Sequence, residues 1–73
     1  MPHSIPCTLL IDNGSSRPES TLRLRRLAAA LGERLGTRVH PVSLQHADKI
    51  PPEALGGVPA ETLAPFLTRR LAA

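Results

Sequence analysis

The first half of the chain has a pattern of apolar and polar residues that predicts a strand, a helix and a second strand. Residues 7–12 (CTLLID) form a short apolar run bounded by turn-forming residues, which is typical of a strand buried on both faces. A helix is predicted from about Pro18, and Gly36 is well placed just past its carboxyl end. Its apolar stripe is Leu24, Leu27, Ala28, Leu31 and Leu35.

A second strand is predicted over residues 38–44 (RVHPVSL). Pro41 cannot donate a ladder hydrogen bond, so we expect this to be an edge strand. Strand, helix and strand at this spacing predict a right-handed crossover between parallel strands. Because two parallel strands do not form a stable sheet alone, we expect another strand to pair with the free edge of the first one.

The second half of the chain predicts a loop and a second helix. Residues 46–61 are rich in proline and glycine, with a short helical turn over residues 52–55. A helix follows from about Thr62, which serves as its cap and places Pro65 in the first turn. Its apolar face is Leu63, Phe66, Leu67 and Leu71. No third strand follows, so residues 1–73 are interpreted as a single partial α/β domain, completed by a second copy of the chain or by a missing C-terminal part.

Composition limits the classes of partner. With 73 residues and Phe66 as the one aromatic residue, the core is small and mainly aliphatic. The net charge of +3 comes from arginines scattered over two helices without interleaved aromatic residues, so we expect no nucleic-acid partner. A lone cysteine, Cys7, and the lack of a signal peptide or membrane span favour the cytoplasm and no membrane partner.

The polar turn after the first strand is the first candidate site, because ligands of open α/β sheets bind beyond the carboxyl ends of the strands. Asn13, Gly14, Ser15 and Arg17 allow two interpretations. They form an ordinary turn in which serine caps the helix, or they bind carboxylates through main-chain donors and the arginine. The turn lacks the glycine spacing and the lysine of a nucleotide-binding loop, so we expect no ATP or NAD.

Histidines provide the second group of candidates. His46 follows the second strand and has Asp48 nearby, which indicates either a metal ligand pair or a solvated loop. His40 and His3 are expected to be structural or exposed. Cys7 is expected to act as a small hydrophobic residue at the start of a buried strand.

Several segments resemble the sirohydrochlorin chelatases of the cobaltochelatase and ferrochelatase type. Residues 9–19 (LLIDNGSSRPE) are similar to the opening of that family, where an apolar strand ends in Gly-His-Gly-Ser and Pro-Glu soon opens the helix. The resemblance continues over residues 27–35 and 39–55, including residues 43–47 (SLQHA) and 52–55 (PEAL). It covers most of the chain up to Leu55.

The resemblance implies a flavodoxin-like α/β sandwich and a lyase of cobalamin or sirohaem biosynthesis. Such an enzyme inserts a divalent metal, most commonly cobalt, as a substrate into a tetrapyrrole. With that substrate, the binding interpretation of Asn13, Gly14, Ser15 and Arg17 is a site for tetrapyrrole carboxylates, and His46 is the candidate metal ligand of this chain.

The chain departs from the family pattern at three positions. Asn13 stands where the family has its histidine, Asp12 where it has a glycine, and Gln45 where it commonly has a glutamate. An amide cannot act as a general base. Two functions therefore stay open: a chelatase, or a non-catalytic homologue that binds a tetrapyrrole or metal or assists a complete chelatase.

Overall fold

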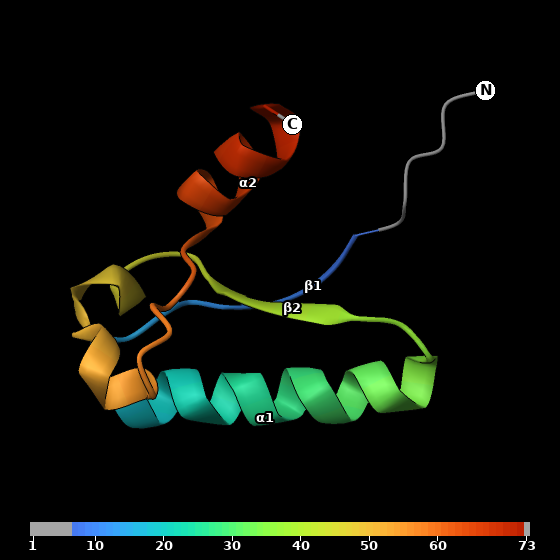
Figure 1. The fold of residues 1–73 in the computed structure, drawn as a ribbon, viewed down its shortest axis with the longest axis horizontal. Coiled ribbons are helices and arrows are strands. Elements are labelled where there is room, and N and C mark those ends of the chain that lie inside the picture. The colour runs from blue at the N-terminus through green and yellow to red at the C-terminus, as the bar shows by residue number, and fades with distance from the viewer. Residues whose placement is uncertain (1–6, 73) are drawn as a thin grey trace.

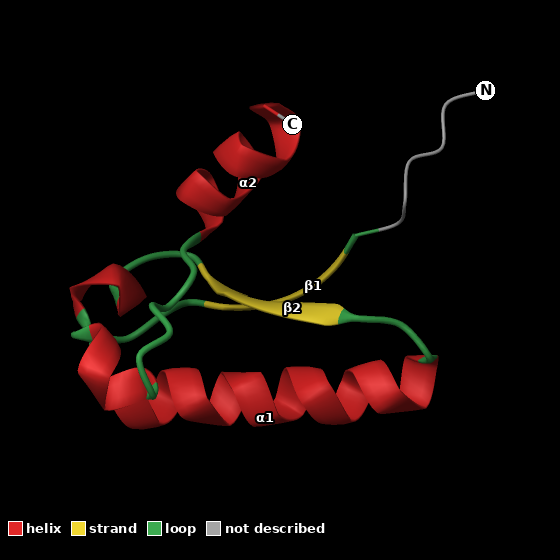
Figure 2. Cartoon of the chain, in the orientation of Figure 1, coloured by secondary structure: helices red, strands yellow, loops and turns green. Residues whose placement is uncertain are grey.

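A computed structural model describes residues 7–72 as a small α/β unit with one two-stranded sheet (Figure 1). In chain order the elements are β1 (Thr8–Asp12), α1 (Pro18–Leu35), β2 (Val39–Ser43), the 3₁₀ segments η1 (Ala47–Lys49) and η2 (Pro52–Leu55), and α2 (Leu63–Ala72). Figure 2 shows the two 3₁₀ segments together beyond one end of the sheet, near the beginning of α1. The predicted order of strands and helices is confirmed, and η1 is an element that the sequence pattern did not predict.

The two strands pair in parallel, as the sequence predicts. Their register runs from Thr8 opposite Val39 to Asp12 opposite Ser43. Figure 1 shows α1 along one face of the sheet and α2 on the opposite side. Because the strands are parallel, their carboxyl ends meet at one edge, and η1 and η2 follow β2 at that edge.

Pro41 lies in the middle of β2, and the hydrogen bonds of later residues show which edge its nitrogen faces. The Leu44 nitrogen donates to the Asp12 carbonyl of β1 at 2.9 Å, whereas the Ser43 nitrogen donates to the Glu61 carbonyl, also at 2.9 Å. Successive residues of a strand face opposite edges, so the Pro41 nitrogen faces outward like that of Ser43. The outer edge forms one isolated bridge, at Ser43, within the described part of the chain. The edge position predicted for Pro41 is confirmed.

The strand β1 is less buried than its apolar sequence predicts. Ile11 is 44% exposed, and Thr8, Leu9 and Leu10 are each partly buried. The prediction of burial on both faces is therefore wrong. Its physical reason is that α1 packs mainly on β2 and that no strand of the described residues pairs with the other edge of β1. Cys7, predicted to start this buried strand, is exposed and precedes it.

The buried apolar side chains come from every element except β1. They are Leu24, Ala28, Val39, Val42, Ala47, Ile50, Leu55 and Phe66. On α1 the buried face is formed by Thr21, Leu24 and Ala28, whereas Leu27 and Leu35 are exposed. The predicted stripe is correct for Leu24 and Ala28 and wrong for Leu27 and Leu35, because the helix turns this narrower face toward β2.

The predicted helix ends are confirmed. α1 begins at Pro18 and ends before Gly36, which has the left-handed φ of 67° that favours glycine. α2 begins at Leu63, directly after Thr62, whose carbonyl accepts a hydrogen bond from the Phe66 nitrogen at 3.1 Å. These boundaries depend on local capping and backbone preferences, which is why the sequence alone indicates them.

The second helix buries only part of its predicted apolar face. Phe66 is buried and Leu63 is partly buried, whereas Leu67 is exposed and Leu71 is 84% exposed. α2 packs on β2 alone among the described elements with substantial contact. Its remaining apolar positions consequently face solvent.

Arg25 ties α1 to the loop that leads into α2. Its guanidinium donates hydrogen bonds to the carbonyl oxygens of Leu55, Val58 and Pro59, at 3.1, 2.7 and 3.2 Å. The helical pattern assigns no role to this arginine, since its partners lie 30 to 34 residues away in the chain. The contact fixes the loop beside the outer edge of β2.

Candidate functional site

The turns that follow β1 and β2 pack against each other at the carboxyl edge of the sheet. Gly14 has a φ of 97°, and a Cβ added to it would lie 1.7 Å from the Gln45 carbonyl oxygen. Only glycine permits so close an approach of two main chains. The predicted site residues after the first strand and those after the second therefore lie at one edge.

The residues of the first turn differ in exposure. Asn13 and Arg17 are exposed, whereas Gly14 and Ser15 are partly buried. The Ser15 Oγ accepts a hydrogen bond from the Arg17 nitrogen at 3.0 Å. Arg17 is the residue that precedes the first turn of α1, and no side chain caps the helix there. Ser15 thus closes a local turn and does not cap the helix, which corrects the capping interpretation.

Few main-chain donors remain for an anion at the beginning of α1. Pro18 has no N–H, the Ser20 nitrogen donates to the Arg17 carbonyl at 3.1 Å, and the Arg17 nitrogen is taken by Ser15. The first turn also carries Glu19, whose negative charge opposes an anion. The exposed Arg17 guanidinium is therefore the main group at this turn that could bind an anion.

A cavity of about 260 Å³ opens beside the end of β1 and is called the Asp12 cavity. Its lining residues are Asp12, Ser20, Arg23, Leu24 and Leu27. The Asp12 Oδ1 is buried and has no hydrogen-bond partner within residues 7–72. A buried carboxylate oxygen is stable only with a donor, a proton or a cation beside it. The sequence pattern does not predict Asp12 as a binding residue, although an acidic residue at the end of an apolar strand is the signal that points to it.

A second cavity, of about 360 Å³, follows the end of β2 and is called the His46 cavity. Its lining residues are Leu44, Gln45, His46, Asp48, Lys49, Thr62, Ala64 and Pro65. His46 has a φ of 74°, a conformation that a non-glycine residue adopts only when its surroundings impose it. Its carbonyl accepts a hydrogen bond from the Lys49 nitrogen at 3.1 Å. The structure thus places the predicted pair, His46 and Asp48, on one cavity.

The predicted metal ligands are few. Within residues 7–72, no group of three or more His, Cys, Asp or Glu side chains could hold a metal ion. His46 and Asp48 are both exposed, so a metal bound there would complete its coordination with atoms of solvent or substrate.

His40 lies away from this edge, within β2. Its ring is tilted against Phe66, with centroids 5.3 Å apart, and its Nε2 accepts a hydrogen bond from Arg70 at 2.9 Å. Burial lowers the pKa of His40 below 6.5, and the charges of Arg38 and Arg70 lower it further against the opposing effect of Glu61. His40 therefore has a structural role, whereas His3 lies outside the described residues.

The chain was also compared with known proteins. Family models, curated proteins and solved structures give no match. No helix within residues 7–72 is long and apolar enough to cross a membrane.

Proposed function

We propose that this chain is a sirohydrochlorin cobaltochelatase-like protein, which inserts a divalent metal, cobalt, into a tetrapyrrole in cobalamin or sirohaem biosynthesis. The observation that carries the proposal is the contact between Gly14 and Gln45. It brings the turns after two parallel strands together, with a cavity beside each. The resemblance of residues 9–55 to the chelatases supplies the reaction and the substrate class.

In this proposal the metal ion and the tetrapyrrole are both substrates. The carboxylates of the tetrapyrrole pair with Arg17 and Arg23, which are exposed at the beginning of α1. Metal insertion also requires a group that holds the ion and a base that accepts the pyrrole protons. The imidazole of His46 suits both tasks, and the carboxylates of Asp48 and Asp12 are further acceptors at this edge.

We further propose that the chain forms part of a flavodoxin-like domain that works in the cytoplasm. Within residues 7–72 the outer edge of β1 has no paired strand and the side chain of Ile11 is exposed, and both support this, since a further strand would cover them. A second copy of the chain, or a missing C-terminal part of the domain, supplies that strand.

A non-catalytic role is the second candidate. Asn13 replaces the histidine of the chelatase pattern, and its amide can neither accept a proton at neutral pH nor bind cobalt well. In that case the chain binds a tetrapyrrole or a metal for delivery, or assists a complete chelatase.

A cobalt-insertion assay on sirohydrochlorin, followed by its absorbance, separates the two candidates. If the chain is the enzyme, the native protein turns over, and H46A loses about a hundredfold in rate, as expected for removal of a proton-transfer group. N13A also loses turnover, because a contact with the tetrapyrrole is removed. If the role is non-catalytic, turnover appears only in N13H, whereas the native chain still binds sirohydrochlorin. A native chain that neither turns over nor binds sirohydrochlorin contradicts both.

A matched pair of arginine variants tests the substrate contacts. R17A should weaken sirohydrochlorin binding about tenfold, because an ion pair with a carboxylate is lost. R34A removes the same charge from an exposed position in the last turn of α1 and should leave binding unchanged. Equal weakening by both variants would show that net charge, and not the turn, attracts the tetrapyrrole.

A further inference from the structure

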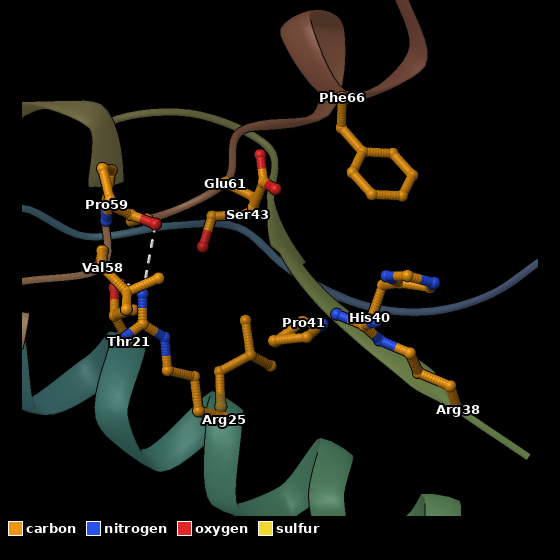
Figure 3. A pocket seen from close by; sticks show the side chains of 12 residues that line it. Thr21, Arg25, Arg38, His40, Pro41, Ser43, Val58, Pro59, Glu61 and Phe66 are labelled. Carbon is orange, nitrogen blue, oxygen red and sulfur yellow. Dashed lines mark hydrogen bonds between the residues drawn. The ribbon is translucent and has the colours of Figure 1, made fainter. Parts of the chain in front are cut away.

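A third cavity lies at the outer edge of β2, the edge that does not pair with β1. Its volume is about 240 Å³, and it is enclosed by α1, β2, the loop before α2 and Phe66 (Figure 3). We call it the β2-edge cavity. Pro41 opens this space, because a residue without an N–H prevents another strand from pairing there.

Two buried residues that line the β2-edge cavity carry hydroxyl groups. Thr21 on α1 is 5% exposed, and Ser43 at the end of β2 is 3% exposed. Neither hydroxyl forms a hydrogen bond to another described residue. Figure 3 shows the Ser43 hydroxyl directed from the strand toward α1, into the space between them. Because both residues line the cavity, their hydroxyls are available as hydrogen-bond donors to a ligand in it.

The walls of the cavity are held in place by the protein itself. Arg25 clamps the loop through the carbonyls of Val58 and Pro59, and the Ser43 nitrogen donates to the Glu61 carbonyl at 2.9 Å. These bonds join α1, β2 and the loop around the cavity. The space is therefore preorganised and does not require a rearrangement to receive a small molecule.

The charges that face the cavity leave a positive excess. Glu61 is paired with Arg69, and the charge of Arg25 is satisfied by three carbonyl oxygens. Arg38 is exposed and forms no ion pair within the described residues. Figure 3 shows its side chain extending along β2 toward Pro41, so that the guanidinium lies at the cavity. Arg38, Thr21 and Ser43 line the same cavity, and a guanidinium with two hydroxyls provides donors suited to an oxyanion.

The remaining wall is apolar and limits the size of the ligand. Leu24 and Phe66 are buried core residues that line the cavity, together with the exposed Val58. The volume of 240 Å³ corresponds to about eight water-sized groups at roughly 30 Å³ each. A carboxylate with a short aliphatic chain matches this combination of donors, apolar wall and volume.

We propose that the β2-edge cavity binds a small aliphatic carboxylate. Arg38 pairs with the carboxylate, the hydroxyls of Thr21 and Ser43 donate to it, and the aliphatic chain packs on Leu24 and Phe66. The proposal uses none of the proposed tetrapyrrole or metal contacts, so it stands whether or not the chain is a chelatase.

Butyrate is the probe for this proposal, added to the ¹⁵N-labelled full chain and followed by amide chemical shifts. Binding should saturate, with the largest shifts at Thr21, Arg38 and Ser43. R38Q should weaken binding about tenfold, because a charge-assisted hydrogen bond is lost. R34Q removes the same charge from an exposed position of α1 outside the cavity and should leave the affinity unchanged. T21V keeps the shape of the side chain, removes its hydroxyl and should also weaken binding.

Three results would overturn the proposal. Shifts that do not saturate, or that spread evenly over all arginines, would show non-specific attraction to positive charge. Equal binding of 1-butanol would show that the cavity selects the apolar chain and not the carboxylate. Inorganic phosphate binding more tightly than butyrate at the same residues would assign the site to phosphate. If R38Q does not fold, T21V tests the proposal by itself. An unchanged affinity of T21V for butyrate would contradict the role of the Thr21 hydroxyl.

Discussion

Gly14, Asp12 and His46 each meet a local constraint at the carboxyl edge of the sheet. Gly14 allows two main chains to touch, Asp12 buries an unpaired carboxylate oxygen, and His46 has a positive φ. Each feature costs stability. Glycine loses more backbone entropy on folding than other residues, the Asp12 oxygen is buried without a partner in the described residues, and the backbone of His46 is strained. All three lie where the proposed substrates bind, which is where proteins commonly accept such costs.

The substitution G14A should be far more destabilising than G56A. Both glycines have a positive φ, 97° at Gly14 and 71° at Gly56. Of the two, only Gly14 would bring an added Cβ against main-chain atoms, at 1.7 Å from the Gln45 carbonyl oxygen. G56A, with nothing within 4 Å, should cost about 1 kcal/mol from backbone strain alone. G14A should cost roughly 3 kcal/mol or more, because the two turns must separate.

Urea denaturation of both variants measures this difference. In a chain of this size, 1 kcal/mol corresponds to a fall of about 4–8 °C in Tm, so thermal unfolding provides an independent check. Equal losses in G14A and G56A would contradict the close contact between the turns.

At the scale of elements, α1 and β2 form the centre of the molecule, and the other segments attach to them. η2 and the following loop are held to α1 by Arg25, and α2 is attached to β2 through Phe66 and a hydrogen bond from Arg70 to His40. The guanidinium of Arg70 also lies 5.4 Å from the centre of the Phe66 ring, within range of a cation–π contact. Few contacts attach each segment, so single substitutions should release a segment without unfolding the centre.

Replacing Arg25 with methionine should loosen the loop after η2. The variant R25M keeps much of the aliphatic stem but removes the donors to three carbonyls, which should cost about 1–3 kcal/mol. Hydrogen exchange should accelerate at the Gly57 amide, which donates to the Pro52 carbonyl at 2.8 Å within this segment.

The neighbouring substitution R26M is the matched control. Arg26 is exposed and forms no hydrogen bond with another described residue, so its loss should leave the Gly57 exchange rate unchanged. Acceleration at Gly57 by R26M and R25M alike would show that helix charge, and not the clamp, protects the loop.

At the scale of the whole molecule, apolar surface is left without cover in the described structure. β1 contributes no fully buried apolar side chain, and Ile11 and Leu27 are both exposed. The Asp12 carbonyl accepts a hydrogen bond from the Leu44 nitrogen, so the main-chain groups of Asp12 face β2. Because successive residues of a strand face opposite edges, the main-chain N–H and C=O groups of Leu9 and Ile11 face the outer edge of β1. An open edge next to exposed apolar side chains favours pairing with another strand.

We expect the chain to self-associate through the outer edge of β1. Sedimentation velocity should show a weight-average mass that rises with protein concentration. I11K should shift this curve toward the monomer, because a lysine at a strand edge opposes pairing. L71K introduces the same charge at an exposed leucine of α2 and should leave association unchanged. A native chain that is monomeric at every concentration would contradict this expectation.

Local preferences of the chain were enough to predict its elements. Pro18 and Gly36 mark the ends of α1, Pro41 marks the outer edge of β2, and Thr62 precedes α2. Each depends on a missing N–H, a permissive backbone or the capping of a neighbouring turn, and these properties belong to a residue and its immediate neighbours. The sequence by itself therefore determined the order of the elements, the parallel pairing and the polar turn at Asn13.

Only the tertiary structure decided which distant segments are neighbours. The contact of Gly14 with Gln45 and the clamp by Arg25 join residues far apart in the chain, and the β2-edge cavity brings Thr21 and Ser43 together. No local pattern encodes such contacts, because they arise when helices settle on a sheet of given width. The same reason explains the error at β1: an apolar run shows that a strand can be buried, whereas burial itself depends on what packs against it.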